Sequence, residues 1–149
     1  MQRIILSFLI LSFGVHADTI NHYMNIANNI PQMEMKADQQ SQAWARSART
    51  MLTLTSETVL ETLTIFNETA KQNGSPLYCV PLSEKVDATA LNELIQQTYR
   101  NISSLQSDKD NMTVSQVALL GLKNKYPCEQ QANTDKSKGI LSVSALHNP

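Results

Sequence analysis

The chain has 149 residues and nearly balanced charge, with 12 Lys and Arg against 13 Asp and Glu. Its 42% of hydrophobic and 17% of charged residues are enough to bury a core, which excludes a chain that is disordered throughout. The basic residues neither outnumber the acids nor cluster, which excludes a nucleic-acid binder that works through bulk charge. With only 4 Gly and 5 Pro, the chain lacks the turn residues of a β-rich fold, so one mainly helical domain is predicted.

Residues 1–17 are predicted to form a signal peptide. Arg3 is followed by an uncharged apolar run from Ile4 to Val15, which is shorter than the roughly 20 residues that cross a bilayer core. The run ends in Val15-His16-Ala17, close to the small-x-small pattern that signal peptidase recognises. These features favour a cleaved leader over a membrane anchor or a buried helix, so we expect cleavage after Ala17 and export.

Two helices are expected before the cysteines: a short one over residues 19–29 and a long amphipathic one that Asp38 caps. A straight helix from Gln39 to Gln72 would be about 50 Å long, longer than a domain of this size is wide. We therefore expect a kink or break between Thr50 and Ser56, where residues 51–55 could also form a short strand. The apolar face of the long helix is predicted to contain Trp44, Ala48, Met51, Leu52, Thr55, Val59, Leu63, Phe66 and Ala70.

The chain that remains after cleavage contains two cysteines, Cys79 and Cys128. Paired thiols of exported proteins are normally oxidised, so a disulfide between them is predicted. Closing a loop of this length contributes about 4 kcal/mol in the loop-entropy model. A redox-active or nucleophilic thiol is less favoured, because no C-x-x-C motif occurs and the remaining histidines, His22 and His147, lie near the two ends.

Two further helices are predicted between the cysteines. The first runs from about residue 88 to 106 and has Asp87 or Thr89 as its cap. The second begins after Thr113-Val114-Ser115-Gln116, a sequence typical of a capping box. We expect the two helices to be antiparallel, with the disulfide joining their outer ends and residues 107–111 free at the opposite end. From the residues alone, that loop is either a probe for a partner or a plain solvated turn.

The sequence offers no convincing catalytic or metal site. The motifs H-E-x-x-H, G-x-S-x-G, GxxxxGK(S/T) and GxGxxG do not occur in it. Asp108, Asp110 and Asn111 faintly resemble a calcium loop, but the central Gly and distal Glu of an EF-hand are missing. Asn67-Glu68-Thr69 is one of four segments with the form of a glycosylation sequon, a number that chance could produce. We therefore expect a binding protein with no metal or cofactor, rather than an enzyme.

Residues 77–128 contain a recognisable framework. It opens with Leu77-Tyr78-Cys79-Val80-Pro81, continues through Leu91-Asn92-Glu93-Leu94-Ile95, and ends with the stretch from Val114 to Tyr126-Pro127-Cys128. This framework resembles that of the Rap/Tai family, periplasmic immunity proteins against amidase effectors of type VI secretion systems. The resemblance implies an all-α fold, frequently a homodimer, that blocks a peptidoglycan-cleaving cysteine amidase by covering its active-site groove. It also implies that a loop between late helices contributes to the contact, and the matching positions are Ser107, Asp108, Lys109, Asp110 and Asn111.

We therefore expect residues 18–128 to form a small all-α helical bundle with one disulfide and no extensive sheet, followed by a mobile tail over residues 129–149. The expected function is that of a periplasmic immunity protein that binds and inhibits a cognate secreted amidase. Its expected partners are that effector and, in a homodimer, a second copy, but neither nucleic acid nor, after signal cleavage, a membrane. The alternatives are a periplasmic stress chaperone, which would expose apolar surface when acid loosens it, and an enzyme with an unrecognised site.

Overall fold

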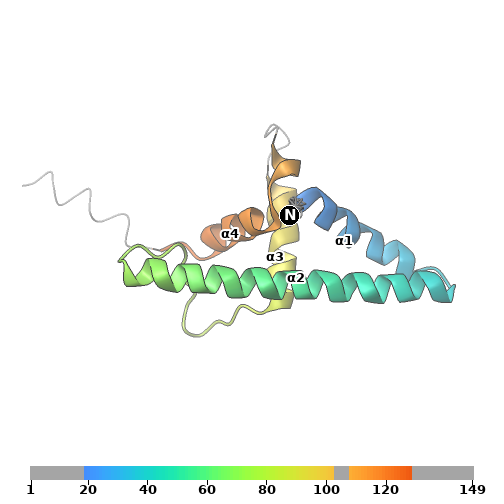
Figure 1. The fold of residues 1–149 in the computed structure, drawn as a ribbon, viewed down its shortest axis with the longest axis horizontal. Helices are drawn as coiled ribbons and strands as arrows, with labels where there is room; N and C mark the ends of the chain where they lie inside the picture. Colours follow the sequence, from blue (N-terminus) through green and yellow to red (C-terminus); the bar gives the residue numbers. More distant parts are fainter. Residues whose placement is uncertain (1–18, 103–107, 129–149) are drawn as a thin grey trace, which may run out of the picture.

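The computed structural model describes residues 19–102 and 108–128, which form four α-helices and one short 3-10 helix (Figure 1). The elements are α1 (Ile20–Glu34), α2 (Gln39–Gln72), α3 (Ala88–Asn101), η1 (Lys109–Asn111) and α4 (Val114–Lys125). Within the described residues the one β-type pairing is an isolated bridge between Thr19 and Thr113, so the predicted all-α class is confirmed. The predicted signal peptide and the tail after Cys128 lie outside the described residues.

The helix α2 is continuous and runs along the whole length of the fold (Figure 1). The break expected between Thr50 and Ser56, and the alternative strand there, were wrong. The hydroxyls of Thr50 and Thr53 donate to the carbonyl oxygens four residues earlier, at 3.1 and 3.0 Å, so these side chains are satisfied inside the helix. A helix of 34 residues, about 50 Å long, fits because the fold is elongated along it.

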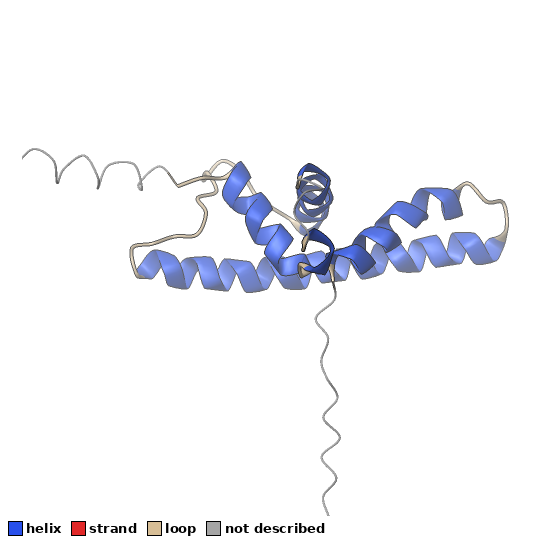
Figure 2. Cartoon of the chain, turned by 90° about the horizontal axis from the view of Figure 1, so that it is seen from above, coloured by secondary structure: helices blue, strands red, loops and turns tan. Residues whose placement is uncertain are grey.

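The other helices pack against one side of α2 (Figures 1 and 2). The helix α1 lies along the N-terminal half of α2 and α4 along its C-terminal half, while α3 crosses between them. The core at their junction contains Ile20, Tyr23, Met24, Ala27, Ile30, Ala45, Ala48, Leu52, Val59, Leu63, Tyr78, Leu91, Ile95, Val114, Val117, Ala118, Leu122 and Tyr126. The hydroxyl of buried Tyr23 donates to Asn92 and lies 3.0 Å from the Ser56 hydroxyl. This contact joins α1, α2 and α3, and burial raises the pKa of Tyr23, although the Ser56 bond opposes that rise.

The helices α3 and α4 cross steeply (Figures 1 and 2), so the expected antiparallel arrangement was wrong. Gly121 of α4 lies at the crossing, where an added Cβ would be 2.5 Å from Thr98 Oγ1 and 3.0 Å from Leu94 Cγ. Because glycine has no side chain, the two helices approach closely at this point instead of lying side by side. The connection over residues 102–113 is also longer than the two to five residues of a tight helical hairpin.

The predicted helix starts are confirmed, but two helix ends differ from the prediction. The Asp38 and Asp87 carboxylates accept from the backbone N–H groups three residues later, and Thr113 and Gln116 form the predicted capping box. The helix α1 continues past Pro31 to Glu34, and α3 ends at Asn101 rather than near residue 106.

The buried face of α2 is only partly the predicted one. Ala48, Leu52, Val59 and Leu63 are buried as expected, whereas Trp44, Met51 and Phe66 are exposed. The residues that are buried follow steps of three and four: Ala45, Ala48, Leu52, Ser56, Val59, Leu63 and Asn67. Two of them, Ser56 and Asn67, are polar and lie inward because each has a hydrogen-bond partner on another element.

Candidate protein-interaction site

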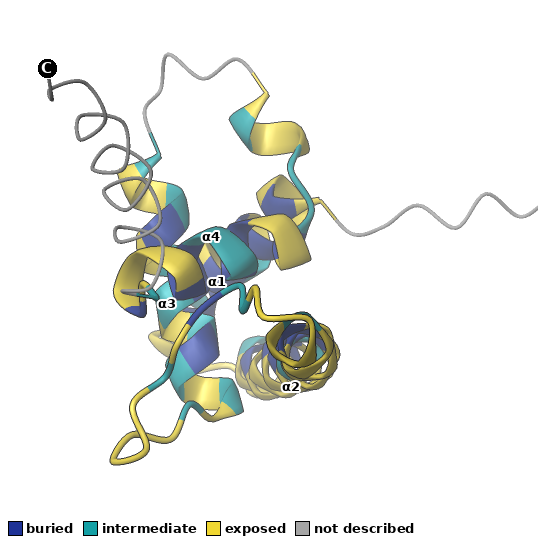
Figure 3. Cartoon of the chain, turned by 90° about the vertical axis from the view of Figure 1, so that its left-hand side faces the viewer, coloured by how far each residue is buried: buried dark blue, intermediate teal, exposed yellow. Residues whose placement is uncertain are grey.

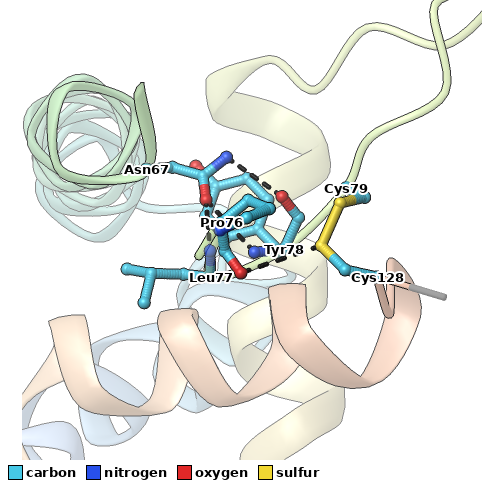
Figure 4. The surroundings of a disulfide bond; sticks show 6 residues. All are labelled: Asn67, Pro76, Leu77, Tyr78, Cys79 and Cys128. Carbon is cyan, nitrogen blue, oxygen red and sulfur yellow. Dashed lines mark hydrogen bonds between the residues drawn. A yellow bond between two sulfur atoms is a disulfide. The ribbon is translucent and has the colours of Figure 1, made fainter. Parts of the chain in front are cut away.

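The disulfide between Cys79 and Cys128 is present as predicted, with an S–S distance of 2.03 Å and a Cα–Cα distance of 5.1 Å (Figure 4). It joins the loop after α2 to the exit of α4. Beside it, the Cys79 N–H donates to the Tyr126 carbonyl at 2.9 Å. The covalent bond and this hydrogen bond fix the two ends of the predicted framework against each other.

A buried amide on α2 orders the same loop, and the sequence reasoning missed its role. The Asn67 Nδ2 donates to the Tyr78 carbonyl at 3.0 Å, and its Oδ1 accepts from the N–H groups of Leu77 and Tyr78 at 2.8 and 3.1 Å (Figure 4). One side chain thus satisfies three backbone groups, as a neighbouring strand would. The signal in the sequence was its place on the line of buried residues, four residues after Leu63.

A cavity of about 630 Å³ lies between this loop and the C-terminal half of α2. Its lining includes Glu68, Lys71, Glu84 and Lys85, so charges of both signs surround it. Tyr78, which also lines it, has a raised pKa because it is desolvated, and the nearby charge of Glu68 adds to that effect.

The loop predicted to contact a partner forms η1 and its flanks. Ser107 lies outside the described residues, whereas Asp108 and Asn111 are exposed. The hydroxyl of Tyr99 on α3 donates to Asp110 Oδ1 at 2.6 Å. The ammonium of Lys109 lies 4.4 Å from the centre of the Tyr99 ring and donates to the Ile102 carbonyl at 3.3 Å. Asp110 and Lys109 therefore hold the loop on α3, and Asp108 and Asn111 are presented outward.

The proton of the Tyr99 hydroxyl is held by the bond to Asp110. The pKa of Tyr99 is raised first because its hydroxyl donates to the Asp110 carboxylate, and then by desolvation and by the charge of that carboxylate. Tyr99 therefore remains a neutral donor at ordinary pH.

The loop also contacts the start of α1, so the expectation that it lies free was wrong. The Ile20 N–H donates to the Met112 carbonyl at 2.8 Å, next to the bridge between Thr19 and Thr113. This contact could not be predicted from local patterns, because it joins segments about 90 positions apart. The 12 residues of α4 place the loop about 18 Å from the disulfide end, so the two ends of this helix are ordered by separate contacts.

A second groove, of about 580 Å³, lies where α3 crosses α4. Its lining includes Leu94, Leu120 and Gly121, the neutral amides of Gln97, Asn101 and Asn124, and the cation of Lys125. Amides donate and accept hydrogen bonds without a charge that titrates.

No other chemistry is visible in the part of the chain that the structure describes. Residues 19–102 and 108–128 contain no group of three or more His, Cys, Asp or Glu that could hold a metal ion. Among these same residues, no helix combines the length and the apolar character needed to span a membrane. No family model, curated protein or solved structure matches this chain.

Proposed function

We propose that this protein is a periplasmic immunity protein that binds and inhibits a peptidoglycan-degrading amidase effector of a type VI secretion system. The observation that carries the proposal is the Cys-Val-Pro opening and Tyr-Pro-Cys ending of residues 77–128, which resemble the Rap/Tai framework and are joined by the disulfide. In this proposal the protein acts stoichiometrically and catalyses nothing itself.

The proposed contact with the amidase is the η1 loop, with Asp108 and Asn111 at its centre. Both residues are exposed, and their carboxylate and amide groups can hydrogen-bond to polar groups that line an enzyme cleft. The loop is held in place by Tyr99, which bonds to Asp110, and by the start of α1, which bonds to Met112. A loop that is already ordered loses little conformational entropy on binding, which favours affinity.

The proposal is tested by titrating the mature protein into the amidase encoded by a neighbouring gene and measuring peptidoglycan hydrolysis. We expect the wild type to inhibit the amidase completely at a fixed stoichiometry. Asp108→Lys should raise the dissociation constant of the complex about tenfold or more, and a tenfold change corresponds to about 1.4 kcal/mol of binding free energy. Glu93→Lys is the matched control, because it makes the same charge change at an exposed position of α3. Both variants should keep the melting temperature of the wild type.

The double variant Asp108→Lys with Asp110→Lys should lose more inhibition, but it also removes the acceptor of the Tyr99 hydroxyl. Its melting temperature therefore has to be measured alongside inhibition. If Asp108→Lys inhibited the amidase as strongly as the wild type, the loop would not be part of the interface. A wild-type protein that binds no such amidase, but prevents many unrelated proteins from aggregating at acid pH, would replace the proposed function by that of a chaperone.

A further inference from the structure

The loop of residues 73–87, which connects α2 to α3, is long and irregular, yet it is ordered. It contains 15 residues and no helix or strand of its own, a length that is uncommon inside a domain unless the loop is functional or disordered. The disulfide at Cys79 and the three hydrogen bonds of the Asn67 side chain hold it in place. In Figure 3 it leaves the near end of α2 and passes to α3, and most of it is coloured as exposed. An ordered loop of this kind indicates a functional part of the molecule.

The cavity of about 630 Å³ between this loop and α2 is already formed in the folded chain. Its volume lies within the range of small-ligand pockets. The disulfide is part of its lining, and the hydroxyl of Tyr126, which follows α4, donates to Glu84 Oε2 at 3.0 Å. Apolar side chains from α2, the loop and α4 also line it: Leu60, Pro76, Val80, Val86 and Leu122. A ligand would therefore gain apolar contacts there without first having to order the protein.

Charges of both signs accompany this apolar lining. Glu68 and Lys71 lie on α2, and Glu84 and Lys85 lie on the loop. In the described part of the chain the one ion pair joins α1 to α2 and involves none of these four residues. The ammonium groups of Lys71 and Lys85 thus have no carboxylate within ion-pair distance among those residues. Both walls of the cavity therefore offer a carboxylate and an ammonium group to a ligand.

We propose that this cavity binds a short peptide with free termini, whose ammonium group pairs with the glutamates and whose carboxylate pairs with the lysines. A ligand with a single charge would meet a like charge on either wall, whereas a ligand that carries both signs can pair with both. Between its charged ends, small apolar side chains would contact the apolar lining. The inference does not rest on the proposed function, because the cavity includes Cys128 beyond the end of α4, whereas the η1 loop precedes the start of that helix.

Titration of the isotope-labelled mature protein with the tripeptide alanyl-leucyl-alanine, followed by NMR, tests the proposal. We expect a dissociation constant of about 0.1 to 1 mM, as for a ligand of this size, with amide shifts concentrated around Val80 and Val86. Acetylation of the peptide amine, or amidation of its carboxylate, should weaken binding about three- to tenfold, because each removes one charge that the cavity pairs. No binding below about 10 mM, or equal binding of the free and the doubly blocked peptide, would overturn the proposal.

The role of the lysines is tested by combining variants with the blocked peptides. Lys71→Gln with Lys85→Gln should weaken binding of the free peptide about three- to tenfold, but should leave binding of the amidated peptide unchanged because the paired carboxylate is already absent. Lys36→Gln with Lys123→Gln is the matched control, since it makes the same charge change at exposed positions outside the lining. Circular dichroism establishes that both variants are folded. Equal weakening by the control would contradict pairing of the peptide carboxylate in this cavity.

The glutamates have the converse test. Glu68→Gln with Glu84→Gln should weaken binding of the free peptide by a similar factor and leave binding of the acetylated peptide unchanged. Glu84→Gln keeps an oxygen that can accept from the Tyr126 hydroxyl, so the wall of the cavity is preserved. The same loss for the free and the acetylated peptide would contradict pairing of the peptide ammonium with these carboxylates.

Discussion

The two halves of α2 are held in the fold in different ways. Along the N-terminal half, the small residues Ala45 and Ala48 pack beneath α1, and an exposed ion pair between Arg49 and Glu34 closes the contact. Along the C-terminal half, one amide, that of Asn67, and one disulfide fix a loop without regular structure. Apolar burial is shared among many contacts, whereas specific bonds concentrate stability in a few residues. Single substitutions should therefore have their largest effects in the C-terminal half.

The largest effect is expected from removal of the disulfide. Reduction, or the double variant Cys79→Ser with Cys128→Ser, should lower the free energy of unfolding by about 4 kcal/mol, because the unfolded chain gains the entropy of a loop of 49 positions. Urea denaturation with and without reductant measures this change. Identical midpoints would show that the disulfide does not stabilise the C-terminal half.

A smaller effect is expected from Asn67→Ala. It should lower the free energy of unfolding by about 2 to 3 kcal/mol, because it leaves backbone groups of Leu77 and Tyr78 buried without a hydrogen-bond partner. Thr69→Ala is the matched control. It removes the same sequon, but it lies at an exposed position and should change stability by less than about 0.5 kcal/mol. Equal losses in urea denaturation for the two variants would contradict the role assigned to the Asn67 amide.

The smallest effect is expected from the Arg49–Glu34 pair of the N-terminal half. The Arg49 guanidinium donates to both carboxylate oxygens of Glu34, at 2.6 and 2.7 Å, and these hydrogen bonds lower the pKa of Glu34. A lowered pKa in the folded state contributes stability above the unfolded value of about 4.3, and this contribution is lost as the pH falls through the folded value.

The melting temperature of Glu34→Gln, which resembles the protonated acid, should therefore lie slightly below that of the wild type at neutral pH. The difference should be small because both side chains are exposed. At acid pH the melting temperatures of Glu34→Gln and the wild type should become equal. A difference that grows on acidification would mean that the sign of this contribution is wrong.

The sequence predicted the helices best where local chemistry decides. Asp38, Asp87 and the Thr113 capping box mark helix starts through bonds within one turn. The face and continuity of α2 were harder to predict, because Ser56 and Asn67 are turned inward by Tyr23 and Tyr78, which are distant in sequence. Hydrophobicity alone placed Met51 and Phe66 inside, whereas both are exposed.

At the candidate site, residue type predicted the disulfide but not the geometry around it. The spacing between helices favoured an antiparallel hairpin, whereas in the structure the helices cross and Thr98 and Leu94 lie close to Gly121. Within the predicted loop, Asp110 and Lys109 were expected to meet a partner, yet both contact Tyr99. A sequence pattern names polar residues of a loop, but it does not show which of them are bonded to the fold.

The unbroken course of α2 has a consequence for how such a protein can evolve. Because α1 and α4 attach to different halves of one rod, substitutions beneath α1 lie far from the disulfide end, and effects of distant sites on stability are nearly additive. Lineages can therefore remodel the α1 half extensively while the α4 half stays constant. Exposed positions within 20–50 can then vary without disturbing the disulfide end.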